Sequence, residues 1–239
     1  MKERPILFKE EMVRAILEGR KTQTRRLNGL AKINENPDMW RFDGFVGIDN
    51  IYAVFCSGYD TLKIKCPFGM PGDKLWVKET FRLGAWREDG RMALDYKASP
   101  EIKRTPWITI PEENDIDGNL FNSIWMKACE ELEQKNIKAD ENGHYSWEPG
   151  KSPLKWKPSI FMPRWASRIN PDVIDIRMER LQDINALDIT CEGVEIQKDW
   201  FAEHAMEAFK SLWDLINEKS GYGWDRNPWV WVVEFRRVK

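Results

Sequence analysis

Short strand-like segments recur along the chain and limit the folds that are open to it. The clearest is WVWVVEFRRV (229–238), and VIDIRMERL (173–181) and KLWVKE (74–79) alternate in the same way. Apolar residues at every second position are typical of strands with one buried face. These segments do not alternate regularly with helices, as they would in a doubly wound fold. The pattern predicts an α+β fold built on a small barrel or a strongly bent mixed sheet, with helices at its flanks.

Two pairs of neighbouring segments predict β-hairpins, because a short turn signal separates two alternating runs in each pair. The pairs are IYAVFC with TLKIKC, around Ser57-Gly58, and FRLGAW with RMALDYKA, around Glu88-Asp89-Gly90. Residues 6–8 predict a further short strand. The polar residues 28–48, which are rich in Gly and Asn, predict a loop.

Helical periodicity marks four stretches, at 9–17, 120–134, 181–194 and 200–216. Gly19 follows the first of them and is a natural helix end. From about residue 98 the chain becomes rich in Pro, Asn, Asp and Glu. We therefore predict a single domain spanning 1–239, with its core at about 1–81 and 156–239 and a large insertion at about 82–155.

The composition limits the partners and the types of site that we expect for this chain. Lys and Arg number 37 and Asp and Glu 39, so a global electrostatic grip on nucleic acid is disfavoured, although a local basic pocket is not. Four scattered cysteines and two histidines fit neither a zinc site nor a disulfide framework. No apolar run reaches the about 20 residues of a membrane span, and no signal peptide is evident. We expect a cytoplasmic protein that needs no metal and no cofactor.

A basic run, Gly19 to Arg26, closes the first predicted helix. It resembles the G-x-K-T-x-x-x-R signature of ASCH domains, which belong to the PUA-like superfamily. Three further stretches resemble that family in the same order: Pro71 to Leu75, 181–194 and 229–238. The chain also looks like ASCH-related proteins of phages and prophages. The resemblance implies a PUA-like barrel, and it leaves out the middle of the chain.

Within that superfamily, small bacterial amidohydrolases deacetylate N4-acetylcytidine with a Lys, a Thr and a Glu. The matching positions here are Lys21, Thr24 and Glu192, and Arg26 matches an arginine of the same signature. The resemblance implies that Thr24 is the nucleophile, Lys21 its base, and Glu192 an acid or an orienting group.

This chemistry has physical requirements. A Thr hydroxyl needs a base to remove its proton, and a Lys serves as that base only if burial or nearby cations lower its pKa. Arg20, Arg25 and Arg26 would supply such cations, and we expect them to bind substrate together with Thr22. Positions 21 and 24 point to opposite faces of a flat strand, so the segment has to turn or bulge for them to converge.

Other residues are candidates for binding substrate. The motif KWKPSIFMPRWASRI (155–169) combines aromatic and basic side chains, which suit base stacking and phosphate contact. We expect substrate contacts from Trp156, Lys157, Arg164, Trp165 and Glu79. A loop that precedes the last strand offers Trp224, Asp225 and Asn227 as well. The competing interpretation is structural: a solvated basic turn, tryptophans that fill the core, and a Glu192 that faces solvent at a helix end.

Four functions are compatible with the sequence. The first is hydrolysis of an amide on a modified nucleoside, and the second is binding of RNA or a modified base without chemistry. The third is a metal-independent ribonuclease. The fourth is a phage-encoded interaction protein that binds a protein partner through the insertion. Near-neutral charge disfavours long non-specific RNA binding, so recognition of RNA or of a nucleoside by one pocket is the leading hypothesis.

Overall fold

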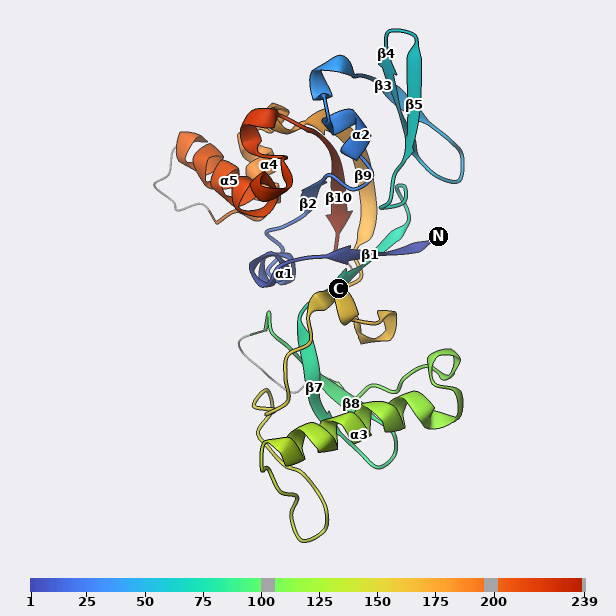
Figure 1. Cartoon of the computed structure of the whole chain (residues 1–239), viewed down its shortest axis with the longest axis vertical. Helices are drawn as coiled ribbons and strands as arrows, with labels where there is room; N and C mark the ends of the chain where they lie inside the picture. The colour runs from blue at the N-terminus through green and yellow to red at the C-terminus, as the bar shows by residue number, and fades with distance from the viewer. Residues whose placement is uncertain (100–105, 196–201, 238–239) are drawn as a thin grey trace. The chain divides into compact units, whose positions relative to one another are not determined.

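The computed structural model describes residues 1–99, 106–195 and 202–237, and it confirms an α+β fold (Figure 1). The chain forms two compact units. Unit 1 consists of Met1–Ile6, Ala15–Val77 and Ile169–Lys239, and unit 2 consists of Leu7–Arg14 and Lys78–Arg168. Unit 2 contains the insertion predicted at 82–155 and extends beyond it at both ends.

Unit 1 is built on a five-stranded sheet in the order β1–β6–β9–β10–β2. The strands are β1 (Glu3–Leu7), β2 (Gln23–Arg26), β6 (Lys74–Lys78), β9 (Asp172–Arg180) and β10 (Trp229–Arg236). The long strands β9 and β10 pair antiparallel along their whole lengths, with a bulge between Glu234 and Phe235. β1 and β2 are the two edges, so the described strands form an open sheet where a barrel was predicted.

Two helices cover one face of this sheet, α4 (Ala186–Cys191) and α5 (Ala202–Asn217). In Figure 1 both helices lie beside β2 and β10. Their apolar residues pack with Val230 and Val232 of β10, which point to the same face because side chains alternate along a strand. Val230 and Val232 of β10 are therefore buried beneath α4 and α5.

The intervening residues of β10 pack against aromatic side chains from a second sheet. That sheet contains β3 (Arg41–Val46), β4 (Tyr52–Ser57) and β5 (Asp60–Lys65). Phe45 stacks on Trp231, with ring centroids 6.2 Å apart, and Phe55 meets Trp229 edge-on at 5.3 Å. The predicted hairpin of β4 and β5 is confirmed. The predicted loop over 28–48 is wrong in part, because it contains α2 (Ala31–Asn34) and β3.

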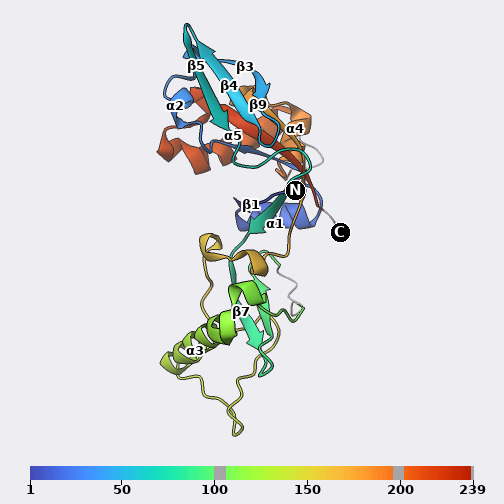
Figure 2. The ribbon, with the colours of Figure 1, turned by 90° about the vertical axis from the view of Figure 1, so that its right-hand side faces the viewer.

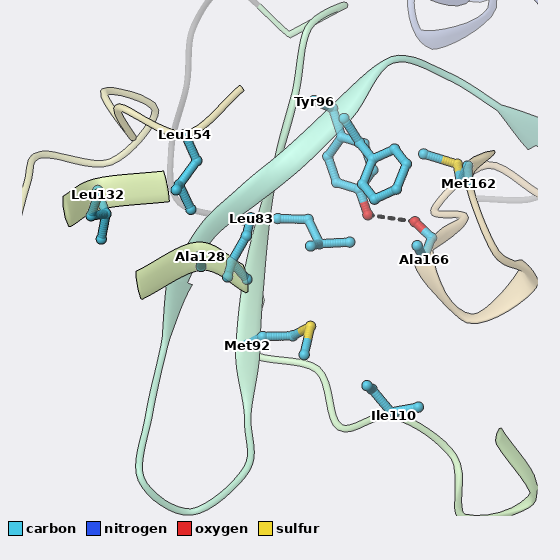
Figure 3. Close-up of a cluster of buried hydrophobic side chains, with 11 residues drawn as sticks. Leu83, Met92, Tyr96, Ile110, Ala128, Leu132, Leu154, Met162 and Ala166 are labelled. Carbon is cyan, nitrogen blue, oxygen red and sulfur yellow. Dashed lines mark hydrogen bonds between the residues drawn. The ribbon is translucent and has the colours of Figure 1, made fainter. Parts of the chain in front are cut away.

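Unit 2 has its own core (Figure 3). The hairpin of β7 (Phe81–Trp86) and β8 (Met92–Tyr96) packs with α3 (Asn119–Gln134), and both the hairpin and the helix match the sequence prediction. The buried Tyr96 hydroxyl donates a hydrogen bond of 2.6 Å to the carbonyl of Ala166. α1 (Glu10–Leu17) begins in the segment of unit 2 and ends in that of unit 1.

Short 3-10 turns complete the described structure, at Pro37–Met39, Glu112–Asn114, Ile116–Gly118, Ser159–Phe161, Arg164–Ala166, Leu181–Asp183, Glu218–Ser220 and Trp224–Arg226. A view from the side shows α3 together with β7 (Figure 2). Across the described ranges, no helix combines the length and the apolar character that crossing a bilayer requires.

Candidate functional site

The segment that follows α1 turns sharply before it enters β2. Gly19 has a φ of +78°, and the amides of Arg20 and Lys21 both donate to the carbonyl of Ala15, at 2.9 and 3.0 Å. Next, the amide of Thr22 donates to the carbonyl of Cys191 in α4 at 2.9 Å. The turn that the sequence required after the helix therefore exists, and it attaches the basic run to α4.

α4 carries the acidic side of the site. Asn185 caps its first turn, because its side chain accepts a hydrogen bond from the amide of Asp188 and the Asp188 carboxylate accepts one from the amide of Asn185. The helix ends at Cys191, and Glu192 and Gly193 follow. A Cβ on Gly193 would lie 2.8 Å from Cβ of Lys21, so a glycine is required where these two segments meet.

Lys21, Arg25 and Glu192 form a buried cluster of charges. Nζ of Lys21 donates to Oε2 of Glu192 at 2.8 Å and to the Glu192 carbonyl at 2.7 Å. Arg25 donates to the other carboxylate oxygen, Oε1, at 3.2 Å. The three side chains are 2%, 1% and 7% exposed, in the order Lys21, Arg25, Glu192. Each carboxylate oxygen of Glu192 thus faces its own cation.

Further charges extend the cluster across the sheet. Arg25 also donates to Asp188 at 3.1 Å and to Glu179 at 2.9 Å. Gln23 donates to Asp188 at 3.0 Å, and Arg177 reaches Asp188 at 3.0 Å. Arg177 additionally pairs with Glu179 and Glu234. The result is a continuous polar network over β2, β9, β10 and α4.

Burial and neighbouring charges shift several pKa values. Burial lowers the pKa of Lys21; the Glu192 charge opposes this shift, and Arg26 and Arg25 add to it. Burial also lowers the pKa of Arg26 to about 10, so that side chain keeps its charge at neutral pH. For Asp188, burial alone would raise the pKa, but the hydrogen bond from Gln23 and the nearby arginines outweigh it and hold the pKa below its usual value.

A cavity of about 660 Å³ opens beside this network within unit 1. Its wall combines polar, charged and apolar side chains and is lined by Ile16, Leu17, Glu18, Gly19, Lys21, Thr22, Gln23, Ile174, Leu187, Asp188, Cys191, Glu234, Phe235, Arg236 and Arg237. Lys21, Gln23 and Asp188 belong to both the cavity wall and the buried network. A ligand in the cavity would therefore contact side chains whose positions are fixed by hydrogen bonds.

Thr24 occupies a different position from Lys21. It pairs with Val233 in the register of β2 and β10, whereas Gln23 pairs with Glu234. Because side chains alternate along a strand, Thr24 and Val233 share the face opposite to Gln23 and Arg25. Thr24 is buried, and it is not among the residues that line the cavity. Its role as a nucleophile stays a prediction.

Arg20 and Thr22 lie beside the cluster, whereas Trp224 and Asn227 have partners elsewhere in unit 1. Arg20 donates to the carbonyl of Gly193 at 3.1 Å, and Thr22 lines the cavity. Trp224 packs into the core beneath α5, and Asn227 accepts a hydrogen bond from the amide of Gln182 at 2.9 Å. These last two residues have structural partners of their own.

Five other predicted substrate-binding residues belong to unit 2, namely Glu79, Trp156, Lys157, Arg164 and Trp165. Glu79 forms a two-pronged ion pair with Arg168, with both distances 2.9 Å. The guanidinium of Arg82 lies over the ring of Trp156, 4.2 Å from its centroid. Lys157 and Trp165 line a cavity of unit 2. Glu79, Trp156, Lys157 and Trp165 therefore have contacts within unit 2.

Sequence reasoning missed Gln23, Asp188, Glu234, Arg177 and Glu179 as site residues. Two signals were present. Asn185 and Asp188 have the spacing of a capping box, which fixes the start of α4 beside the basic run. Arg177 and Glu179 alternate on one face of β9 with a two-residue period. Neither signal indicates by itself which cations these groups meet.

No group of three or more His, Cys, Asp or Glu side chains lies close enough to hold a metal ion within the ranges that the structure describes. No family model, no curated protein and no solved structure matches the chain.

Proposed function

We propose that unit 1 is an ASCH-like domain whose cavity binds a nucleoside or a nucleotide of RNA. The observation that carries the proposal is a cavity of about 660 Å³ whose wall includes the buried, hydrogen-bonded Lys21. This volume lies within the range of about 300–1,000 Å³ that is typical of small-molecule sites. The resemblance of Gly19 to Arg26 to the ASCH signature supports the same assignment.

The chemistry of the wall supports a nucleobase as ligand. Glu234 lines the cavity with a side chain that is 39% exposed, and its carboxylate suits the donors on a base edge. Gln23 and Asp188 line the same wall, and their hydrogen bonds with Arg177 and Arg25 hold that wall in place. Apolar side chains such as Leu187 and Phe235 suit the faces of a base.

The same cavity offers cations for a phosphate. Arg236 and Arg237 line it, and arginine is a common partner of phosphate oxygens. The chain as a whole has no excess of positive charge, because it contains 37 Lys and Arg against 39 Asp and Glu. Attraction of a phosphate would therefore come from this local pair of arginines.

Amide hydrolysis is the reaction to test at this site. Burial lowers the pKa of Lys21, as a general base requires, and Glu192 accepts its hydrogen bond at 2.8 Å. The proposal assigns proton transfer to this pair. Thr24 is the nucleophile to be tested, because the resemblance to the amidohydrolases implies that role.

The experiment measures binding and turnover separately. Calorimetry with cytidine, N4-acetylcytidine and a short single-stranded RNA reports binding, and chromatography of N4-acetylcytidine reports hydrolysis. We expect binding to weaken in Gln23→Ala and Asp188→Asn, and to be unchanged in Glu203→Gln, an exposed position on α5. Circular dichroism checks that each variant is folded. The absence of binding for all three ligands in the intact protein would refute the proposal.

A further inference from the structure

Unit 2 contains a cavity of its own, of about 430 Å³. With one exception its lining is apolar or aromatic: Phe81, Leu83, Met92, Leu94, Leu120, Ile124, Phe161, Pro163 and Trp165, together with Lys157. Four of these residues, at 157, 161, 163 and 165, come from the Trp- and Pro-rich motif at 155–169. The nucleoside-binding function proposed for unit 1 does not involve this cavity.

Three elements of unit 2 form the walls. The β7–β8 hairpin contributes residues such as Leu83 and Leu94, which are paired across the two strands. α3 contributes Leu120 and Ile124, which are four residues apart and so lie on one face of the helix. In Figure 3, Leu83 lies between α3 and the segment that carries the end of the motif.

Among the lining residues, Lys157 is the only one that carries a charge at neutral pH. Lys157 is exposed at the wall of the cavity, and partial desolvation there lowers the pKa of its ammonium group; the charge of Lys127 lowers this pKa further. Glu131 acts in the opposite direction. However, that carboxylate is already engaged, because it accepts hydrogen bonds from Nζ of Lys135 at 2.6 Å and from the amide of Lys155 at 2.7 Å. An added anion would stabilise the Lys157 charge.

We propose that this cavity binds a small apolar monocarboxylate, an aromatic or short-chain aliphatic acid, with its carboxylate at Lys157. An apolar wall stabilises the body of such a ligand by burying its surface, and one cation fixes its orientation. A nucleobase fits poorly, because its edges carry several polar groups and this lining offers few partners for them. The volume lies in the lower half of the usual range for small-molecule sites, which favours a compact ligand.

Calorimetry on the full chain tests the proposal with matched pairs of probes. Phenylacetate and octanoate are the acids, and phenylacetamide and octanamide are their neutral counterparts. We expect an acid to bind about 10- to 100-fold more tightly than its amide, the ratio that a charge-assisted hydrogen bond provides.

Variants distinguish the contribution of the Lys157 charge to binding from that of the apolar lining. Lys157→Met is expected to remove the preference for the acid, and Lys157→Arg to retain it. Ile124→Phe, which fills the cavity, is expected to weaken acid and amide alike. Lys155→Met, an exposed neighbour outside the lining, serves as the matched control and is expected to change neither. Thermal unfolding confirms that each variant is folded.

Three results would overturn the proposal. One is that neither acid binds to the intact protein. Another is that acid and amide bind equally well. The third is that Lys155→Met reduces the preference as strongly as Lys157→Met, because the effect would then arise from general surface charge.

Discussion

The buried pair of Lys21 and Glu192 predicts a large and strongly non-additive effect on stability. Glu192→Gln removes the carboxylate that faces Lys21 at 2.8 Å and Arg25 at 3.2 Å. Breaking a buried ion pair from one side costs about 3–5 kcal/mol, because it leaves a charge without compensation. Lys21→Met is expected to cost less, about 1–3 kcal/mol, since Glu192 keeps its hydrogen bond from Arg25.

The double variant, with Lys21→Met and Glu192→Gln together, completes a double-mutant cycle. With both members removed, the uncompensated charge disappears, so the loss is expected to be smaller than the sum of the single losses by about 0.5–3 kcal/mol. Urea unfolding gives the free energies, and hydrogen exchange of α4 peptides assigns the change to unit 1. The partly exposed pair of Lys97 and Glu10, 3.5 Å apart, serves as the control and is expected to contribute at most about 1 kcal/mol. Losses that add within about 0.5 kcal/mol would refute the reasoning.

The same pair fixes the sign of a pH dependence. Because burial lowers the pKa of Lys21 in the folded protein, the unfolded chain holds that proton more tightly. The free energy of unfolding therefore rises with pH between the lowered pKa and the ordinary value of 10.5. As the pH rises through this window, the free energy of unfolding of the wild-type protein is expected to increase relative to that of the Lys21→Met variant. A relative loss would mean that the attraction of Glu192 outweighs burial.

Two further predictions concern unit 1. Gly193→Ala adds a Cβ 2.8 Å from the nearest side-chain carbon at a φ of +79°, whereas Gly221→Ala meets no atom within 4 Å at a φ of +82°. Urea unfolding is expected to show a loss for Gly193→Ala that exceeds that for Gly221→Ala by about 1–3 kcal/mol, and equal losses would contradict this. Burial raises the pKa of the Cys66 thiol to about 11, so iodoacetamide at pH 8 is expected to label it far more slowly than the partly exposed Cys56. Mass spectrometry measures the rates, which become similar in urea; comparable rates in the folded protein would contradict the prediction.

Elements with a strong local signal were predictable from the sequence. α1 ends where Gly19 indicates, and β10 follows the alternating run at 229–238 closely. Both signals are local, since a helix end requires one residue in the left-handed region and a strand requires a two-residue period. The same local logic identified both hairpins.

Elements defined by distant partners were not predictable in this way. β3 lies in a segment rich in Gly and Asn and contains a bulge between Phe42 and Gly44, which breaks the alternation. Its strand conformation depends on pairing with β4 and on aromatic contacts to β10. Similarly, Lys21 and Glu192 are 171 residues apart, and only the resemblance to ASCH domains grouped them.

Because of the position of Thr24, nucleoside binding and amide hydrolysis at the proposed site can be tested independently. Arg25 contacts Glu192, and the strand period puts Thr24 on the opposite face of β2, beside Val233. A mechanism that uses Thr24 therefore needs substrate to reach across the edge strand, whereas binding in the cavity does not. Thr24→Val, which keeps the shape of the side chain, is expected to leave nucleoside affinity unchanged. If hydrolysis occurs and survives this substitution, Thr24 is not the nucleophile, and the resemblance misassigns the threonine.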